Sequence, residues 1–320
     1  MPRGTLLTLV CLVHFAALLP LVREAAESPN DASRFGAAVS LAAGGGYGLA
    51  APYAGTLDRA LRDDGVFISD KPPLLNVLAG SVAWMRLRAG GGEASLSGTY
   101  RLVTILLSLV PATLTLGALG ALLLRLGRSP IEAALAALLL GLTTSLTVYA
   151  ITFANHALAA LLVMGTVILL PARDCAGRPW LLGLVAGTLP LIDVPAGSVI
   201  GLVTLGHVAL TLRRVPWGFL AGAAIPAVVG LGLNRVLTHT WLPVYFHGEM
   251  YEYEGSVWRT LPSGLPPYPV RVFERLIGMT VGSQGFVLLW PVSLFALAGL
   301  RRALRAPASP REESIARWTA

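Results

Sequence analysis

The segment 69–74 (SDKPPL) holds Lys71, the only lysine among the 320 residues of this sequence. A lysine ammonium group is a compact point charge that suits a phosphate, and the adjacent Asp70 would keep it charged. The segment lies where a polar stretch becomes apolar, at the level where a lipid phosphate would lie in a membrane. The pattern indicates phosphate binding by Lys71, although a solvated ion pair with Asp70 would explain the same two residues.

Asp31 and Arg34 form a second candidate pair. The segment 31–43 predicts a short helix, and its three-residue spacing places both side chains on one helical face. A carboxylate is favoured at a helix N-terminus. A helix cap with a surface ion pair is therefore the alternative to a role in chemistry.

Asp193 and His156 stand at the edges of apolar runs. An acid at membrane depth suggests a functional site, but Asp193 could simply mark a turn between two helices. His156 begins an apolar run, and a structural role is its alternative.

Aromatic residues alternate with acids and a histidine in the segment 241–258. One interpretation is an aromatic belt at a membrane interface. The other is a surface for a carbohydrate or a lipid headgroup, because aromatic faces and carboxylates suit sugar C–H faces and hydroxyls. The candidate pocket residues are Tyr245, His247, Glu249 and Tyr251.

Metal and redox chemistry have little support in the sequence. Known metal and nucleotide motifs are absent, and the acidic pair Asp63-Asp64 fits a turn equally well. Cys11 and Cys175 form neither a metal motif nor a disulfide framework. We therefore expect no metal and no cofactor.

The composition is that of an integral membrane protein. Apolar residues make up 55% of the chain and charged residues 13%, against roughly 25% charged in soluble domains. The net charge of +7 is not a nucleic-acid signal, because the arginines lie mainly at the ends of apolar runs, where they orient helices in a membrane.

Charge asymmetry predicts an all-α bundle of about eight spanning helices. If Arg301 and Arg302 are cytoplasmic, the basic turns alternate consistently back along the chain. The segment 72–85 then cannot be a single crossing, and we expect a juxtamembrane helix there. The expected spans are 4–22, 102–124, 131–149, 157–170, 181–192, 196–212, 217–237 and 284–300.

One transmembrane domain, 1–302, accounts for most of the chain. It would carry two outer loops, 23–101 and 238–283. The tail, 303–320, is polar and ends like the approach to another helix. We therefore expect that the chain is either truncated or a short member of its family.

This layout resembles the GT-C superfamily of polyprenyl-phosphate-sugar glycosyltransferases, in particular lipid A aminoarabinose transferases and bacterial protein O-mannosyltransferase-like proteins. The segment 31–35 (DASRF) resembles their Asp-Glu-x-Arg-Tyr motif, and 70–74 (DKPPL) resembles their acid-Lys-Pro-Pro-Leu motif. The segment 282–291 resembles their glycine-rich entry to the helix after the second loop. Ala32 departs from the family pattern, and relatives carry further helices.

The resemblance implies transfer of a sugar from a polyprenyl-phosphate donor to a protein, lipid or glycan acceptor on the outer face of a bacterial inner membrane. Asp31 would be the general base, and Lys71 with Arg34 would bind the donor phosphate. Asp70 would orient Lys71 or bind the acceptor, and no metal would be needed. The remaining pocket residues would be His156, Asp193 and the 245–253 stretch.

The alternative function is a non-catalytic transporter or a protein that binds lipid-linked glycans. A transporter would show paired helix breaks at mid-membrane. The charges here cluster at the outer surface instead, which favours chemistry on a lipid headgroup.

Overall fold

The protein is mainly helical, with one short β-hairpin. This computed structural model describes residues 4–90, 95–170, 178–213, 215–258, 274, 277–278 and 292–319. The α-helices are α1 (Thr5–Leu18), α2 (Pro29–Ala42), α3 (Pro73–Ala89), α4 (Leu96–Thr104), α5 (Val110–Arg125), α6 (Pro130–Leu142), α7 (Leu146–Ile151), α8 (Asn155–Leu169), α9 (Pro179–Ile192), α10 (Val194–Leu212), α11 (Trp217–Thr238), α14 (Val292–Arg305) and α15 (Pro310–Thr319).

The hairpin consists of β1 (Arg59–Leu61) and β2 (Phe67–Ser69), which pair antiparallel with Ala60 opposite Ile68. Its turn contains Gly65 at a φ of 81°, a conformation that glycine adopts without steric cost. The sequence did not predict this hairpin, because each strand is only three residues long.

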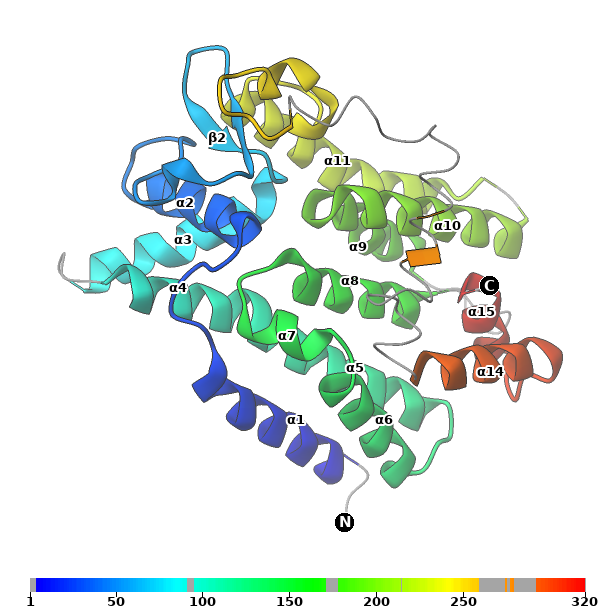
Figure 1. The fold of residues 1–320 in the computed structure, drawn as a ribbon. Helices are drawn as coiled ribbons and strands as arrows, with labels where there is room; N and C mark the ends of the chain where they lie inside the picture. Colours follow the sequence, from blue (N-terminus) through cyan, green and yellow to red (C-terminus); the bar gives the residue numbers. More distant parts are fainter. Residues whose placement is uncertain are drawn as a thin grey trace.

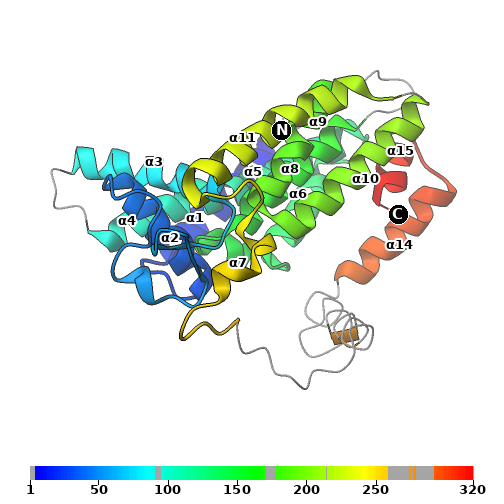
Figure 2. The same cartoon turned by 90° about the horizontal axis from the view of Figure 1, so that it is seen from above.

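The elements are arranged so that the polar loops gather at one end of the helical bundle. Figures 1 and 2 show α2, α3 and the hairpin at that end, beside the segment that follows α11, while α14 and α15 lie at the other end. Buried side chains from the hairpin and the segment after α11 share one cluster with Ala37 and Tyr47. The two predicted outer loops therefore pack against each other.

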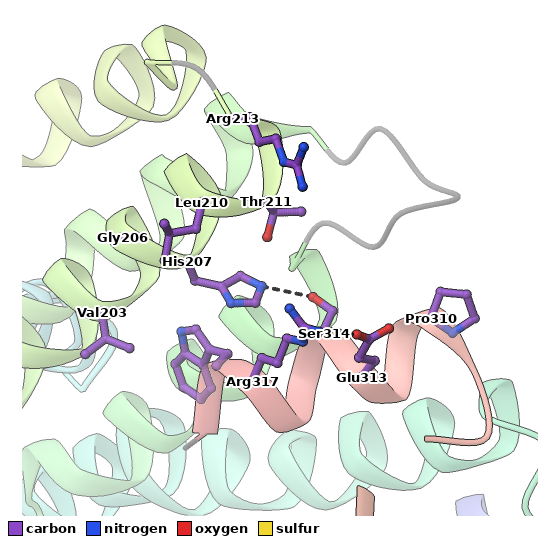
Figure 3. Close-up of a pocket in the computed structure, with 11 residues that line it drawn as sticks. Val203, Gly206, His207, Leu210, Thr211, Arg213, Pro310, Glu313, Ser314 and Arg317 are labelled. Atoms are coloured by element: carbon purple, nitrogen blue, oxygen red, sulfur yellow. Dashed lines mark hydrogen bonds and ion pairs between the residues drawn. The ribbon is translucent and has the colours of Figure 1, made fainter. Parts of the chain in front are cut away.

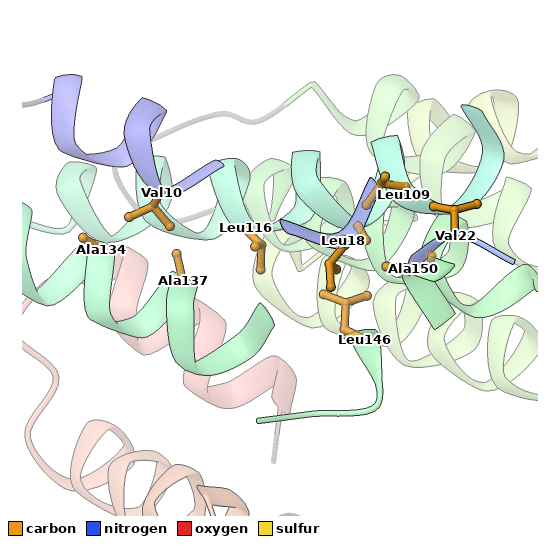
Figure 4. Close-up of a cluster of buried hydrophobic side chains, with 11 residues drawn as sticks. Val10, Leu18, Val22, Leu109, Leu116, Ala134, Ala137, Leu146 and Ala150 are labelled. Carbon is orange, nitrogen blue, oxygen red and sulfur yellow. The ribbon is translucent and has the colours of Figure 1, made fainter. Parts of the chain in front are cut away.

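The largest buried cluster joins α1 to the helices that follow the first loop (Figure 4). Leucine and valine side chains of α1 pack against alanines of α6, which present little side chain and let the helices approach. The labelled members are Val10, Leu18, Val22, Leu109, Leu116, Ala134, Ala137, Leu146 and Ala150.

Helices α9 and α11 approach each other closely at two glycines. A Cβ on Gly183 would collide with the Phe219 carbonyl oxygen, and one on Gly222 would collide with that of Trp180. Small residues at such positions allow backbones to approach, which is how apolar helices gain packing energy when lipid surrounds them.

Helix α2 confirms the short helix predicted at 31–43. It begins two residues earlier because Ser28 and Asp31 form a reciprocal capping box. Pro29 occupies the first helical turn, where its missing N–H group costs nothing. Helix α3 likewise begins at a proline, Pro73.

Within the part of the chain that the structure describes, three helical segments are long and apolar enough to cross a membrane: Leu96–Arg125, Val194–Leu212 and Trp217–Thr238. Four other apolar segments are shorter: Thr5–Leu21, Pro130–Leu142, Asn155–Leu169 and Pro179–Ile192. The structure thus agrees with a helical membrane protein, while the eight predicted crossings are not shown. Helix α3, at 17 residues, is not among the candidate spans.

The segment Leu96–Arg125 contains a π-helical turn, Ile105–Leu109, directly before α5. Pro111 follows in the first turn of α5. Proline lacks an N–H group and its ring crowds the preceding turn, and a π-turn is a common way for a helix to absorb such a disturbance.

The predicted single helix 131–149 is wrong, because two helices, α6 and α7, occupy this stretch. The threonines at the break bond back to the helix they end: Thr143 and Thr144 donate their hydroxyls to the carbonyls of Leu139 and Leu140. Such back-bonding competes with continued helix. The apolar composition of the run hid this break.

The last predicted helix, 284–300, lies only partly within the described residues, where α14 begins at Val292 and ends at Arg305. The 282–291 motif lies outside them. The tail contains a further helix, α15, which packs its Ile315 and Trp318 against the cluster formed by α9, α10 and α11.

Candidate functional site

Lys71 lies at the junction between β2 and α3, in the end of the bundle where the two loops meet. The side chain is largely buried, with 7% of the residue exposed. Strand β2 ends at Ser69, and Pro72-Pro73 starts α3. The backbone between them is therefore held by a strand on one side and by a helix on the other.

Two carboxylates hold the Lys71 ammonium group. Its Nζ atom lies 2.8 Å from Oδ2 of Asp58 and 3.2 Å from Oδ1 of Asp70. Burial by itself would lower the pKa of Lys71, but the attraction of the Asp70 and Asp58 carboxylates outweighs it and raises that pKa. The cation therefore persists at neutral pH.

Burial also raises the pKa of Asp70, with a contribution from the negative charge of Asp58, while Lys71 and Arg34 oppose the shift. Only 2% of Asp70 is exposed. Burying two carboxylates and one ammonium group away from water costs desolvation free energy, which is offset only while the charges stay paired.

A cavity of about 410 Å³ opens at this ion cluster. Both of the predicted outer loops contribute to its wall, and the Lys71 Nζ atom lies 5.8 Å from the centre of the Tyr245 ring. Burial raises the pKa values of Tyr245 and Tyr251, so both phenols remain protonated donors. The lining residues are Asp58, Asp70, Lys71, Tyr245, Gly248, Tyr251 and Trp258.

Arg34 is a buried cation without full pairing, which is close enough to Asp70 to be attracted by it but is not among the residues that line the cavity. It projects from α2 with 2% exposure, and its Nε–H donates to Oδ1 of Asn30 at 3.0 Å. Its Nη1 atom is buried and makes no hydrogen bond within the part of the chain that the structure describes. Burial lowers the pKa of Arg34, against the attraction of the Asp70 and Asp193 carboxylates. An anion entering here would supply a missing partner.

Asp31 is also buried, but its carboxylate serves the start of α2. Oδ1 accepts hydrogen bonds from the Ser28 N–H, the Ser28 hydroxyl and the Ala32 N–H, and Oδ2 accepts from the Glu27 N–H. The Tyr100 hydroxyl donates to Oδ2 at 2.9 Å. Asp31 is not among the residues that line the Lys71 cavity, so the structure supports its alternative interpretation as a cap.

Asp193 and His156 come together, as expected for a shared site. Oδ2 of Asp193 lies 3.7 Å from Nδ1 of His156 and accepts a hydrogen bond from the side-chain amide of Asn155 at 2.9 Å. Asp193 also caps α10 by accepting from the Ala196 N–H. Asp193 also attracts Arg34 electrostatically, so the pair lies near the Arg34 guanidinium.

Only some of the candidate pocket residues in the segment after α11 line the cavity. Tyr245 and Tyr251 line the cavity, whereas His247 pairs through Nδ1 with Oε1 of Glu249 at 3.0 Å. The Glu249 side chain is 72% exposed. The tyrosines thus join Lys71, whereas His247 and Glu249 are not lining residues, although Gly248 between them is.

Asp63 and Asp64 take separate partners: Asp63 lies 2.6 Å from His239, and Asp64 pairs with Arg62 at 2.7 Å. Among the residues that the structure describes, no group of three or more potential ligands could hold a metal ion. The acidic pair therefore anchors the hairpin turn.

Sequence reasoning missed Asp58, Tyr47 and Asn76. Tyr47 donates its hydroxyl to the Lys71 carbonyl at 3.3 Å and accepts from the Asn76 amide at 2.7 Å. Asp58 gave no signal, because nothing in the sequence shows that the hairpin brings residue 58 back to residue 71. Trp258 belonged to the recognised aromatic stretch.

Comparison of the chain with protein-family models, with curated proteins and with solved structures gives no match. The function is therefore inferred from the site itself.

Proposed function

We propose that this protein is a membrane glycosyltransferase that moves a sugar from a polyprenyl-phosphate donor to a hydroxyl acceptor at the outer membrane surface. The observation that carries the proposal is the aromatic cavity around Lys71, where both loops converge on one buried cation. A lysine binds the donor phosphate, tyrosine and tryptophan faces suit the sugar, and apolar helices suit the lipid. The setting would be a bacterial inner membrane.

In the proposed reaction, the acceptor oxygen attacks the anomeric carbon while the bond from that carbon to the phosphate oxygen breaks. The acceptor proton passes to a carboxylate, and polyprenyl phosphate leaves. Lys71 and Arg34 stabilise the charge that develops on the leaving phosphate. Neither residue requires a metal ion to do so.

The general base is the role on which resemblance and geometry differ. The resemblance implies Asp31, whereas the carboxylates that line the cavity are Asp58 and Asp70. A base must come within hydrogen-bonding reach of the acceptor hydroxyl, and Asp31 would have to give up cap hydrogen bonds to do this. We therefore propose Asp58 as the base, with Asp70 orienting Lys71, and test Asp31 beside it.

The test is transfer from radiolabelled polyprenyl-phosphate sugars in membranes that contain the full chain. Lys71→Ala should lower the rate roughly 100-fold or more, as removal of a charge-stabilising group does. Asp58→Asn should lower it roughly 100-fold or more as well. Asp64→Asn, which changes an exposed acid paired with Arg62, is the control and should leave the rate unchanged.

Two results would overturn this proposal. One is a wild-type protein that transfers no sugar from any such donor, and the other is a Lys71→Ala variant that matches wild type. Loss of transfer in Asp31→Asn, with Asp58→Asn active, would instead return the base to Asp31.

A lipid-linked-glycan binder without catalysis is the second candidate. The observation that favours it is the engagement of Asp31 in the cap and of Lys71 with two acids. A binder would retain a radiolabelled donor on the purified protein, lose it in Lys71→Ala, and form no product with any acceptor.

A further inference from the structure

A second cavity, of about 420 Å³, lies between α10 and α15 (Figure 3). Its wall includes two arginines, Arg213 and Arg317, together with Glu313 and His207. Leu210 and Trp318 supply apolar surface. None of these residues belongs to the Lys71 site.

The cavity lies at the opposite end of α10 from that site. Helix α10 begins after Asp193, which contacts His156, and ends before Arg213. Its 19 residues span roughly 28 Å at 1.5 Å per residue. This distance is close to the thickness of a bilayer core, so the two cavities would face opposite membrane surfaces.

Specific side-chain contacts fix α15 against α10. Nε2 of His207 lies 3.0 Å from the Ser314 hydroxyl, and the Trp318 indole N–H donates to the Thr204 hydroxyl at 3.0 Å. Two hydrogen bonds, one from each of these contacts, therefore fix the two helices that form the cavity.

The charges in the cavity are unequally paired. The Arg317 guanidinium lies 2.6 Å from Oε1 of Glu313, one helical turn away. Arg213 has no hydrogen bond or ion pair with any other residue that the structure describes. The lining thus carries two guanidinium groups and one carboxylate, a positive excess that suits a phosphate.

The surface around this end of the bundle has the character of a membrane interface. Trp217 and Trp180 are 73% and 50% exposed, and Leu210 is 81% exposed. Exposed tryptophans beside arginines are typical of the headgroup level, and basic pockets between helices on the cytoplasmic side bind anionic headgroups.

We propose that the α10–α15 cavity binds the phosphate of an anionic phospholipid on the cytoplasmic face, with Arg213 and Arg317 as its ligands. The exposed Leu210 side chain lies along the acyl chain. The proposal does not depend on the transferase activity, since it concerns the other membrane surface.

The test uses the purified full chain, freed of lipid in a neutral detergent. Its thermal unfolding midpoint is followed while phosphatidylglycerol, phosphatidylcholine with the same acyl chains, or sodium phosphate is added. A ligand that binds only the folded state raises the midpoint in proportion to its occupancy. Phosphatidylglycerol should raise the midpoint, and phosphatidylcholine should not.

Charge variants then assign the ligands. Arg213→Asn and Arg317→Gln should each weaken the apparent affinity for phosphatidylglycerol about fivefold. Glu313→Gln should tighten it, because it removes the opposing charge. Arg88→Gln, which changes an arginine near Trp84 on α3, is the control and should bind as wild type does.

Asparagine tolerates the left-handed conformation that Arg213 adopts, with a φ of 52°. If the unfolding midpoint of Arg213→Asn without lipid matches that of wild type, the end of α10 is intact. Any loss of lipid binding in this variant then reflects the missing guanidinium group. Arg213→Lys keeps the charge and should keep most of the binding.

Equal stabilisation by the two lipids, or unchanged affinity in the Arg213→Asn/Arg317→Gln double variant, would overturn the proposal. If millimolar sodium phosphate raises the unfolding midpoint as much as phosphatidylglycerol does, the phosphate bound here does not come from a lipid. That result would assign the two arginines to a free phosphate instead.

Discussion

Lys71 keeps its charge because protein groups replace the water that burial removes. Asp58 and Asp70 lie within 3.2 Å of its ammonium group. Such a cluster is a weak source of stability, since the desolvation cost of buried ions offsets most of their attraction. We interpret the burial of this ion cluster, which adds little stability, as a functional requirement for a cation at residue 71.

The first prediction concerns the buried acid Asp70. Its pKa is raised, mainly by burial, so its contribution to stability is fully present below the unfolded pKa and is lost as the pH rises through the folded pKa. Ionised Asp70 therefore costs stability at neutral pH. The unfolding midpoint of Asp70→Asn minus that of wild type, measured at the same pH, should therefore increase as the pH rises from about 4 to about 8.

Thermal unfolding of both proteins at several pH values provides the measurement. Asp64→Asn is the control, because Asp64 has its pKa lowered to about 2 by hydrogen bonding with Arg62, the opposite direction. A difference between Asp70→Asn and wild type that stays constant or falls with rising pH would contradict the prediction.

The second prediction concerns the buried hydrogen bonds below Lys71. Tyr47→Phe removes both the donor to the Lys71 carbonyl and the acceptor for the Asn76 amide. Buried polar groups left unsatisfied cost about 1–3 kcal/mol, so the variant should lose several degrees of unfolding midpoint.

Removing both polar partners separates this effect from packing. The double variant Tyr47→Phe/Asn76→Leu should regain part of the loss caused by Tyr47→Phe, because the Asn76 amide is then gone. A double variant with the full sum of the two single losses would show that the Tyr47–Asn76 hydrogen bond contributes nothing.

At the scale of elements, α9 and α11 depend on glycine for their contact. Each places backbone where a methyl group of the other helix would have to lie. Proline also occurs inside both helices, Pro190 in α9 and Pro226 in α11, where each removes a backbone donor. The close packing of neighbouring helices is what holds these interrupted helices together.

The third prediction compares two glycines of α11. Gly222→Ala should destabilise the protein by roughly 3 kcal/mol, at the upper end of overpacking effects, because the added methyl group meets the Trp180 backbone. Gly232→Ala should be neutral or stabilising, since nothing lies within 4 Å of its Cβ position and alanine favours helix. Unfolding midpoints measure both variants, and equal midpoints would refute the contact.

At the scale of the whole molecule, the two ends of the bundle differ in chemistry. One end gathers the hairpin, α2 and the segment after α11 around acids and tyrosines, while the other gathers arginines near α10 and α15. Figures 1 and 2 show this separation along the bundle. By the positive-inside rule, the arginine-rich end would be cytoplasmic and the Lys71 cavity would face the outer side.

The fourth prediction tests that orientation. In a chain with Cys11 and Cys175 replaced by alanine, Gly90→Cys after α3 should react with a membrane-impermeant thiol reagent added outside intact cells. Arg128→Cys, between α5 and α6, should react only after the membrane is opened. Reaction of residue 90 only from the cytoplasm would show that α3 crosses the membrane.

Much of the secondary structure was predictable from composition and end signals. Helices α2, α3, α8, α9, α10 and α11 lie within a few residues of their predicted positions, because capping residues and prolines act locally. The break between α6 and α7 was missed, since its threonines look compatible with an apolar helix until their hydroxyls bond back to the preceding turn.

The sequence by itself determined that Lys71 is unique, that it stands at the start of a helix, and that an acid precedes it. Those properties depend on residue identity and on neighbours along the chain. Only the tertiary structure decided that Asp58, Tyr245 and Tyr251 line one cavity with Lys71 and that Asp31 serves its own helix cap. These partners come from distant segments, and a contact between distant segments is set by how whole elements pack rather than by local pattern.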